Sequence, residues 1–263
     1  MSIKLLTQDV RDVVKSIDPT TAASLARDIA FVVIGGRPSF MLDYGSRNVT
    51  TNHLKGISRR AAEMFNVDTG TIAVVDLHGT YFVCNVEVLA SLNVNQVVFV
   101  DVGSEMPCVL QGDDSRRHGI LAAISDVVSA IKGGDTVDIG LVLRERAHAG
   151  VAPPTVAGVL LGYPVAYACE PSAMTSAANS LSSCVLTLHA MEGRENGEKN
   201  HPKTISGWTM PSNLVMDAQT ITQFEAGLNA WKCRLASAAQ NLGLPAPAYV
   251  VSEDVGRHSR VIF

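Results

Sequence analysis

The pattern of apolar and polar positions along the chain predicts short buried strands that alternate with helices. Apolar runs that are too short for a helix and end at Gly, Pro or Asp are typical of strands covered on both faces. They predict strands at 39–42, 72–75, 81–84, 96–100, 137–143, 164–169, 184–189, 204–209, 248–252 and 257–263. Apolar residues spaced three and four apart predict helices at 8–17, 19–34, 53–65, 86–92, 115–132, 156–161 and 214–242.

Residues that begin and end helices support two of these helices. Asp18 can accept hydrogen bonds from the first turn of the helix 19–34, and Pro19 suits its first position. Gly133 and Gly134 follow the helix 115–132 and predict its end.

The order of the elements predicts the fold class. In the first half strands alternate with helices, which favours a mostly parallel sheet, although 81–84 also fits a hairpin partner of 72–75. In the second half strands follow one another without helices, which favours mixed or antiparallel pairing. We therefore expect one α/β domain over 1–263 with helices on both faces, and residues 1–35 as a helical extension packed on it.

Composition and charge remove several classes of protein. The chain has 263 residues, of which 47% are hydrophobic and 17% charged, and this balance excludes intrinsic disorder. A net charge of −4 without a run of Lys or Arg gives no basic surface for a nucleic acid. No apolar run reaches the ~20 residues of a membrane span. The expected partner is a small molecule, without nucleic acid or membrane, and a homo-oligomer remains open.

The cysteines predict the cellular compartment. There are five, an odd number, and no two of them form a C-x-x-C pair. Their mostly apolar surroundings favour buried, reduced thiols, which are typical of a reducing compartment. We therefore expect a cytoplasmic protein.

Three aspartates follow predicted strands and are the candidate catalytic residues. They are Asp43, Asp76 and Asp101, each placed after an apolar run. Ligands of open parallel sheets bind beyond the carboxyl ends of the strands, so paired strands would bring these carboxylates to one edge. Such a cluster could hold a divalent metal or hydroxyl groups, or provide a general acid and base. The alternative is that each aspartate only caps the turn that follows it.

Further polar or conformationally special residues are candidates for ligand binding. Gly162 frees the backbone at a corner, where Tyr163 would present its ring and hydroxyl to a pocket or only form a turn. His148 could join a site at a strand end with Arg144 or Arg146 binding an anion, or lie on a solvated loop. The candidate ligand-binding residues are Tyr44, His78, Arg144, Gly162 and Tyr163.

Known catalytic motifs are mostly absent from the sequence. It contains no P-loop, no G-x-G-x-x-G, no G-x-S-x-G and no H-E-x-x-H. The segment Asp76-Leu77-His78-Gly79-Thr80 resembles the first motif of haloacid-dehalogenase-type phosphatases, with His78 in place of the second acid. That resemblance implies Asp76 as the nucleophile of a phosphatase, which is a minor alternative.

Three longer segments resemble one protein family. They are NQVVFVDVGS at 95–104, AGVLLGYPVAY at 157–167 and VVSEDVGRHSRVIF at 250–263. In order and spacing they are similar to an uncharacterised eukaryotic family typified by the human chromosome 1 open reading frame 74 protein. The resemblance implies that Asp43, Asp101 and the Gly162-Tyr163-Pro164 corner fall at family motif positions. It implies no activity.

Two classes of function follow from the sequence. The first is a small-molecule-binding α/β protein or enzyme with an acidic site at the carboxyl ends of the strands, where a divalent metal is a possible cofactor. The second is a non-catalytic interaction or scaffold protein. We expect the first class to have a cleft that holds at least two of the three aspartates.

Overall fold

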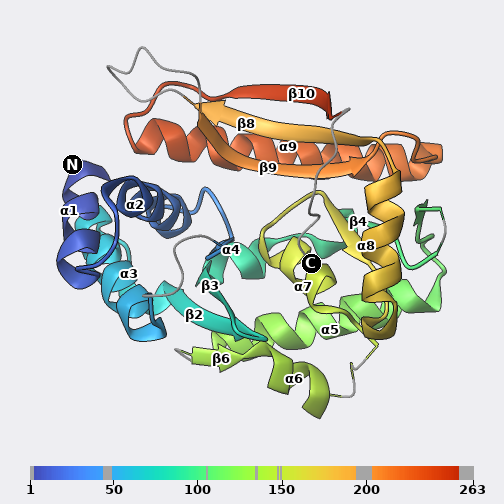
Figure 1. The fold of residues 1–263 in the computed structure, drawn as a ribbon, viewed down its shortest axis with the longest axis horizontal. Coiled ribbons are helices and arrows are strands. Elements are labelled where there is room, and N and C mark those ends of the chain that lie inside the picture. Colours follow the sequence, from blue (N-terminus) through green and yellow to red (C-terminus); the bar gives the residue numbers. More distant parts are fainter. Residues whose placement is uncertain are drawn as a thin grey trace.

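Three small sheets surrounded by helices make up the fold in the computed structural model (Figure 1). The structure describes residues 3–43, 49–104, 106–133, 136–146, 148, 150–193 and 203–254. The first sheet has the order β1 (Ser39–Met41), β3 (Thr80–Asn85), β2 (Ile72–Leu77) and β6 (Thr136–Asp138). The second has the order β5 (Cys108–Val109), β4 (Val98–Asp101) and β7 (Val165–Ala168), and the third β10 (Ala248–Asp254), β8 (Leu186–Gly193) and β9 (Lys203–Pro211).

Helices connect and cover these sheets. They are α1 (Ile3–Val13), α2 (Pro19–Val33), α3 (Thr51–Phe65), α4 (Val86–Ser91), α5 (Ser115–Lys132), α6 (Ile139–Glu145), α7 (Pro153–Leu160), α8 (Met174–Ser183) and α9 (Ala218–Asn241). The start of α2 is confirmed, because Asp18 accepts a hydrogen bond from the Thr21 N–H and Pro19 is the first helical residue. The bounds of α5 also agree with the prediction. Within the described ranges, no helix is both long and apolar enough to cross a membrane.

Strands β4 and β7 lie in the middle of the core and are buried on both faces. In β4 the Phe99 side chain packs in a cluster with α5 and α7, whereas Val98 and Val100 pack with α9 and the third sheet. This explains why residues 97–100 are apolar without alternation. The cluster around α1 and α2 includes Val74 and Val83 of the first sheet, so the N-terminal helices share a core with its strands.

The predicted mostly parallel sheet in the first half of the chain is wrong. Among the described strands, parallel pairing joins only β2 to β6 and β4 to β7. Strands β2 and β3 form an antiparallel hairpin in which Leu77 pairs with Thr80, which confirms the alternative given for 81–84. The two turn residues, His78 and Gly79, have φ values of 54° and 85°, which is typical of a tight two-residue hairpin turn. The expected antiparallel pairing in the second half is confirmed by β8, β9 and β10.

Two further differences concern single elements. The predicted strand 137–143 is wrong beyond Asp138, because this residue caps α6 by accepting a hydrogen bond from the Leu141 N–H. Helix α8 was not predicted, because its Ser, Thr and Ala residues carry little apolar periodicity. The predicted strand 257–263 lies outside the described residues.

Candidate functional site

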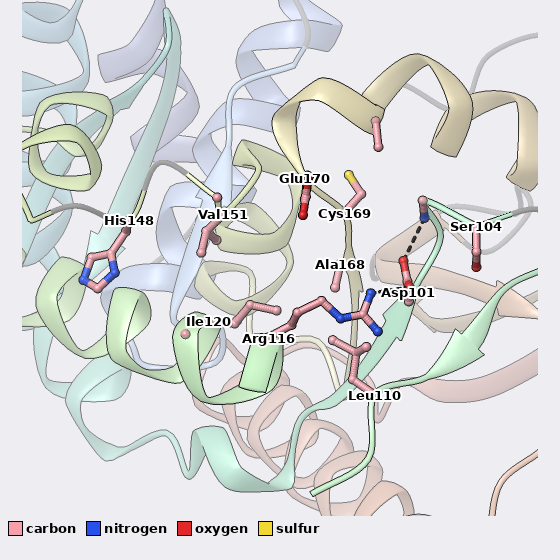
Figure 2. A pocket seen from close by; sticks show the side chains of 14 residues that line it. Asp101, Ser104, Leu110, Arg116, Ile120, His148, Val151, Ala168, Cys169 and Glu170 are labelled. Carbon is pink, nitrogen blue, oxygen red and sulfur yellow. Dashed lines mark hydrogen bonds and ion pairs between the residues drawn. The ribbon is translucent and has the colours of Figure 1, made fainter. Parts of the chain in front are cut away.

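A cavity of about 540 Å³ opens at the carboxyl ends of the parallel strands β4 and β7 (Figure 2). Cavities of this size hold small organic ligands in other proteins. The lining comes from both strand ends, from the first turns of α5 and from the segment before α7. This is the position at which parallel α/β sheets bind ligands.

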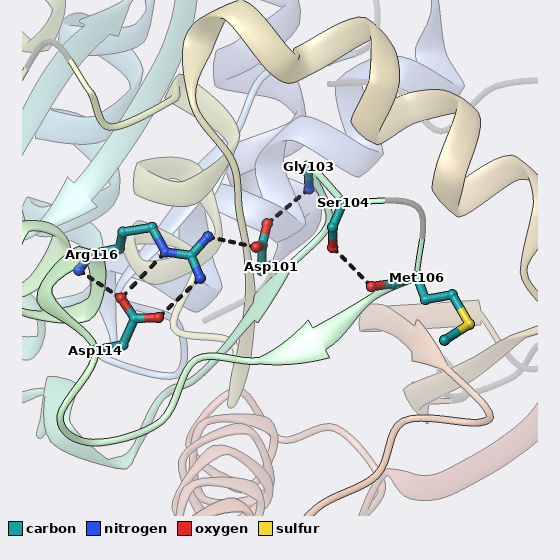
Figure 3. A network of polar contacts seen from close by, with 6 residues as sticks. All are labelled: Asp101, Gly103, Ser104, Met106, Asp114 and Arg116. Carbon is teal, nitrogen blue, oxygen red and sulfur yellow. Dashed lines mark hydrogen bonds and ion pairs between the residues drawn. The ribbon is translucent and has the colours of Figure 1, made fainter.

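Asp101 is the last residue of β4 and lies in the wall of this cavity. Its residue is 8% exposed, and its Oδ1 accepts a hydrogen bond from the Gly103 N–H at 2.9 Å. Its Oδ2 accepts a second bond from Arg116 Nη1 at 2.6 Å. Both oxygens of this nearly buried carboxylate therefore have a donor within the protein, which fixes the orientation of the side chain (Figure 3).

Arg116 stands between two carboxylates on the first turn of α5. Its Nη2 donates to Asp114 Oδ2 at 2.9 Å, while Asp114 also caps the helix by accepting from the Arg116 N–H (Figure 3). The hydrogen bonds from Asp114 and then Asp101 raise the pKa of the guanidinium. The same contact with Arg116 lowers the pKa of the Asp114 carboxyl. The positive charge of the Arg116 guanidinium is thus already neutralised by carboxylates of the protein.

The segment after β7 provides a thiol and a carboxylate. Cys169 and Glu170 follow the last residue of the strand, and both line the cavity. Burial, and secondarily the Asp101 charge, raise the pKa of the Cys169 thiol. This thiol therefore remains protonated at neutral pH, unlike the thiolate that nucleophilic catalysis requires.

His148 lines the cavity away from Asp101. In the view of Figure 2 it lies at one side and Asp101 and Ser104 at the other, with Ile120 and Val151 between them. A residue of α5 orients the His148 ring, because His148 Nε2 lies 2.8 Å from Asp126 Oδ2. The cavity is consequently polar at its two sides and apolar between them.

The charged groups of the lining leave an excess of negative charge. Two carboxylates, Asp101 and Glu170, and one guanidinium, Arg116, line the cavity, and that guanidinium is also bound by Asp114 outside it. A negative, partly enclosed surface attracts cations and hydrogen-bond donors and repels anions.

A second cavity, of about 490 Å³, includes two other predicted site residues. Asp43 and Tyr163 both line it, together with residues of α2 and β9. Asp43 is an exposed residue of this lining, and desolvation nevertheless raises the pKa of its carboxyl.

Asp76 and His78 belong to the hairpin between β2 and β3 and line neither cavity. Asp76 Oδ1 accepts a hydrogen bond from the Gly79 N–H at 2.6 Å, as the capping interpretation expects. His78 is exposed at the turn and lies against Gly140 of α6.

The remaining predicted residues have other surroundings. Gly162 has a φ of +71°, and a Cβ there would lie 2.4 Å from Pro38 Cγ, so the backbone and the packing both require glycine. Arg144 is exposed in the last turn of α6 and lines neither cavity. Tyr44 lies outside the described residues.

The predicted convergence of the three aspartates on one edge is wrong. Asp43 follows β1 and Asp76 belongs to β2, both in the first sheet, whereas Asp101 belongs to the second sheet. Asp101 and Asp43 line different cavities. In the part of the chain that the structure describes, no three His, Cys, Asp or Glu side chains are grouped as they would be to hold a metal ion.

Sequence reasoning missed most of the residues that accompany Asp101. Cys169 and Glu170 follow a correctly predicted strand, and the rule that selected Asp101 would have selected them too. Arg116 shows no such signal, because its place beside Asp101 depends on how α5 packs against β4.

Comparison with known proteins gives a family without an assigned activity. A family model described as a domain of unknown function (DUF4504) matches residues 10–241. No curated protein and no solved structure matches the chain. The matched region contains β4, β7 and all the residues that line the first cavity. Since the match covers most of the 263 residues, the chain belongs to this DUF4504 family of unknown function.

Proposed function

We propose that this protein binds a small neutral or cationic organic molecule, bearing hydroxyl or amine groups, in the cavity at the ends of β4 and β7. The observation that carries the proposal is the pairing of Arg116 with both Asp101 and Asp114. This pairing leaves the cavity with acceptors and negative charge to offer, and with no unpaired cation from Arg116 for an anionic ligand.

The walls add a preference for a ligand with an apolar body. Leu110, Ile120, Val151 and Ala168 line the cavity and are buried core residues with faces towards it. Apolar walls with a few convergent polar groups are typical of small-molecule sites. A molecule with a flat or aliphatic middle and donors at its ends would contact Asp101 and the apolar wall together.

Binding is favoured over covalent catalysis by the state of the thiol. Burial, and secondarily the Asp101 charge, raise the pKa of Cys169 and disfavour its thiolate. His148 is oriented by Asp126 but lies on the opposite side of the cavity in Figure 2. Neither group is arranged as an activated nucleophile with its base.

The proposal is tested with compounds that share a body and differ in charge. Suitable pairs are adenosine with adenosine monophosphate, glucose with glucose phosphate, and phenethylamine with phenylpropionate. A ligand at a hundredfold excess over its Kd stabilises a protein by about 2.7 kcal/mol, which moves the thermal transition by roughly 5–10 °C. We expect a shift from the neutral or cationic member of at least one pair and none from its anionic partner.

Two variants separate this cavity from other sites. Asp101→Asn removes the charge at the cavity wall and should abolish the shift, whereas Glu63→Gln, on the exposed surface of α3, should retain it. Preference for the anionic members, or equal shifts in both variants, would overturn the proposal. No shift with any compound would favour the scaffold interpretation of the chain.

We also propose that the chain is related to the human chromosome 1 open reading frame 74 protein. The segment Leu161-Gly162-Tyr163-Pro164 is its most specific support. The backbone requirement for glycine at Gly162 gives this motif a structural reason to recur within a family.

A further inference from the structure

The second cavity has a polar lining of a different kind from the first. It lies where α2, the end of β1, the turn after α7 and the edge strand β9 meet, and it shares no residue with the cavity at β4 and β7. Two arginines and two aspartates line it, so it has no net charge but offers both signs. Phe40, Leu161 and Ile205 contribute apolar wall.

Arg37 is a cation with unused donors in this cavity. Its Nη1 donates to Asp28 Oδ1 at 3.2 Å, and both side chains are largely buried, with 14% and 10% of their surface exposed. Within the described residues this is its single side-chain hydrogen bond, and its buried Nε has no acceptor. A guanidinium has five N–H donors, so Arg37 can still bind a carboxylate.

Asp43 and Tyr163 are two further polar groups that line the same cavity. In the described part of the chain no basic side chain forms an ion pair with Asp43 and no group hydrogen-bonds the Tyr163 hydroxyl. Desolvation raises the pKa of both groups, and Arg37 is a nearby charge for both. Asp43 thus offers the cavity a carboxylate that a positively charged group would neutralise.

We propose that this cavity binds an apolar α-amino acid as a zwitterion, with its carboxylate at Arg37 and its ammonium group at Asp43. The ligand matches the charges of the cavity because it has no net charge yet carries both signs. Its side chain would lie against the apolar wall formed by Phe40, Leu161 and Ile205. A bare anion would leave Asp43 unpaired, and a simple amine would leave the donors of Arg37 unused.

The test uses L-leucine and L-methionine as probes, with calorimetry on the full chain. N-acetyl-L-leucine lacks the ammonium charge and L-leucinamide lacks the carboxylate. We expect both derivatives to bind at least tenfold more weakly than L-leucine. Equal binding of N-acetyl-L-leucine would show an anion site, and equal binding of L-leucinamide an amine site. Either result would overturn the zwitterion assignment.

Variants then locate the site. Asp43→Asn keeps the shape of the exposed side chain and should weaken the binding of L-leucine at least tenfold. Asp101→Asn, in the other cavity, and Glu63→Gln should bind L-leucine as the unaltered chain does. Circular dichroism of each variant establishes that it is folded. Unchanged affinity in Asp43→Asn, or no binding of either amino acid, would overturn the proposal.

Discussion

Arg116 joins the carboxyl end of β4 to the first turn of α5, because its Nη1 donates to Asp101 Oδ2 across 2.6 Å. The carboxylate is nearly buried, whereas half of the Arg116 side chain is exposed. The pair therefore orients Asp101 at the cavity more than it stabilises the fold, since solvent screens a half-exposed charge.

Replacing Asp101 with Asn should lower the free energy of unfolding by only about 1 kcal/mol. The side chain keeps its size, and Arg116 keeps Asp114 as a partner. Urea denaturation followed by circular dichroism measures the change. Asp113→Asn is the matched control, because Asp113 is exposed on the same loop, and its transition should not move. Identical midpoints for both variants would contradict the structural role of Asp101.

The cysteines should react with iodoacetamide in an order set by exposure and pKa. Cys108 and Cys233 are exposed and should react first, whereas Cys84 is fully buried, which raises the pKa of its thiol, and should react last. Cys169 should be slower than Cys108, and faster in Asp101→Asn because a charge that raises its pKa is gone. Mass spectrometry of timed samples measures each site. Faster reaction of Cys169 than of Cys108 with iodoacetamide would indicate an activated thiolate and would contradict this description.

Gly162→Ala should destabilise the protein by at least about 1–2 kcal/mol. The left-handed backbone disfavours any side chain, and the new Cβ would lie too close to the Pro38 ring. Thermal unfolding compared with Gly112→Ala provides the measurement. Gly112 has open space around it and an ordinary backbone, so its variant should unfold as the unaltered chain does. Similar transitions for the two variants would be incompatible with the described corner.

His189 should make the protein less stable in acid. Its ring stacks on Trp208 at a centroid distance of 4.2 Å, its Nδ1 lies 2.6 Å from the Tyr249 hydroxyl, and Lys232 lies over the Tyr249 ring. Burial lowers the pKa of His189 below 6.5, so the unfolded chain takes up the proton more readily. The contribution of neutral His189 to the free energy of unfolding should be fully present above pH 6.5 and should fall as the pH drops below 6.5.

Urea midpoints at pH 7.5 and pH 5 measure this dependence, with His189→Gln as the comparison. Whatever its absolute stability, the variant should lose less between the two pH values than the unaltered chain. A loss of the same size in both proteins would assign the acid sensitivity to other groups.

The sequence predicted most elements of the fold but only part of how the strands pair. Apolar runs located β4 and β7 correctly because both are buried on two faces, which makes them apolar throughout. The β2–β3 hairpin was predicted only as an alternative for 81–84, beside a mostly parallel sheet. The deciding residues are His78 and Gly79, whose positive φ values close the turn, and a His-Gly pair is a weak signal for that geometry.

The sequence indicated a polar residue at the end of a parallel strand, but only some of the residues that line the cavity there. A polar group at the carboxyl end of a parallel strand is a local signal, and it identified Asp101. Arg116 and His148 enter the same cavity from segments far from Asp101 in the chain, and only tertiary packing brings them there. Asp43 and Tyr163 lie together for the same reason, in a cavity that no sequence spacing indicates.

The most direct test of small-molecule binding at β4 and β7 is an amide NMR titration of the isotope-labelled chain with the compound that gives the largest thermal shift. The account predicts that the strongest chemical-shift changes fall at Gly103, Ser104, Gly150 and Cys169, and that they disappear in Asp101→Asn. Changes centred elsewhere, or an undiminished response in Asp101→Asn, would contradict it.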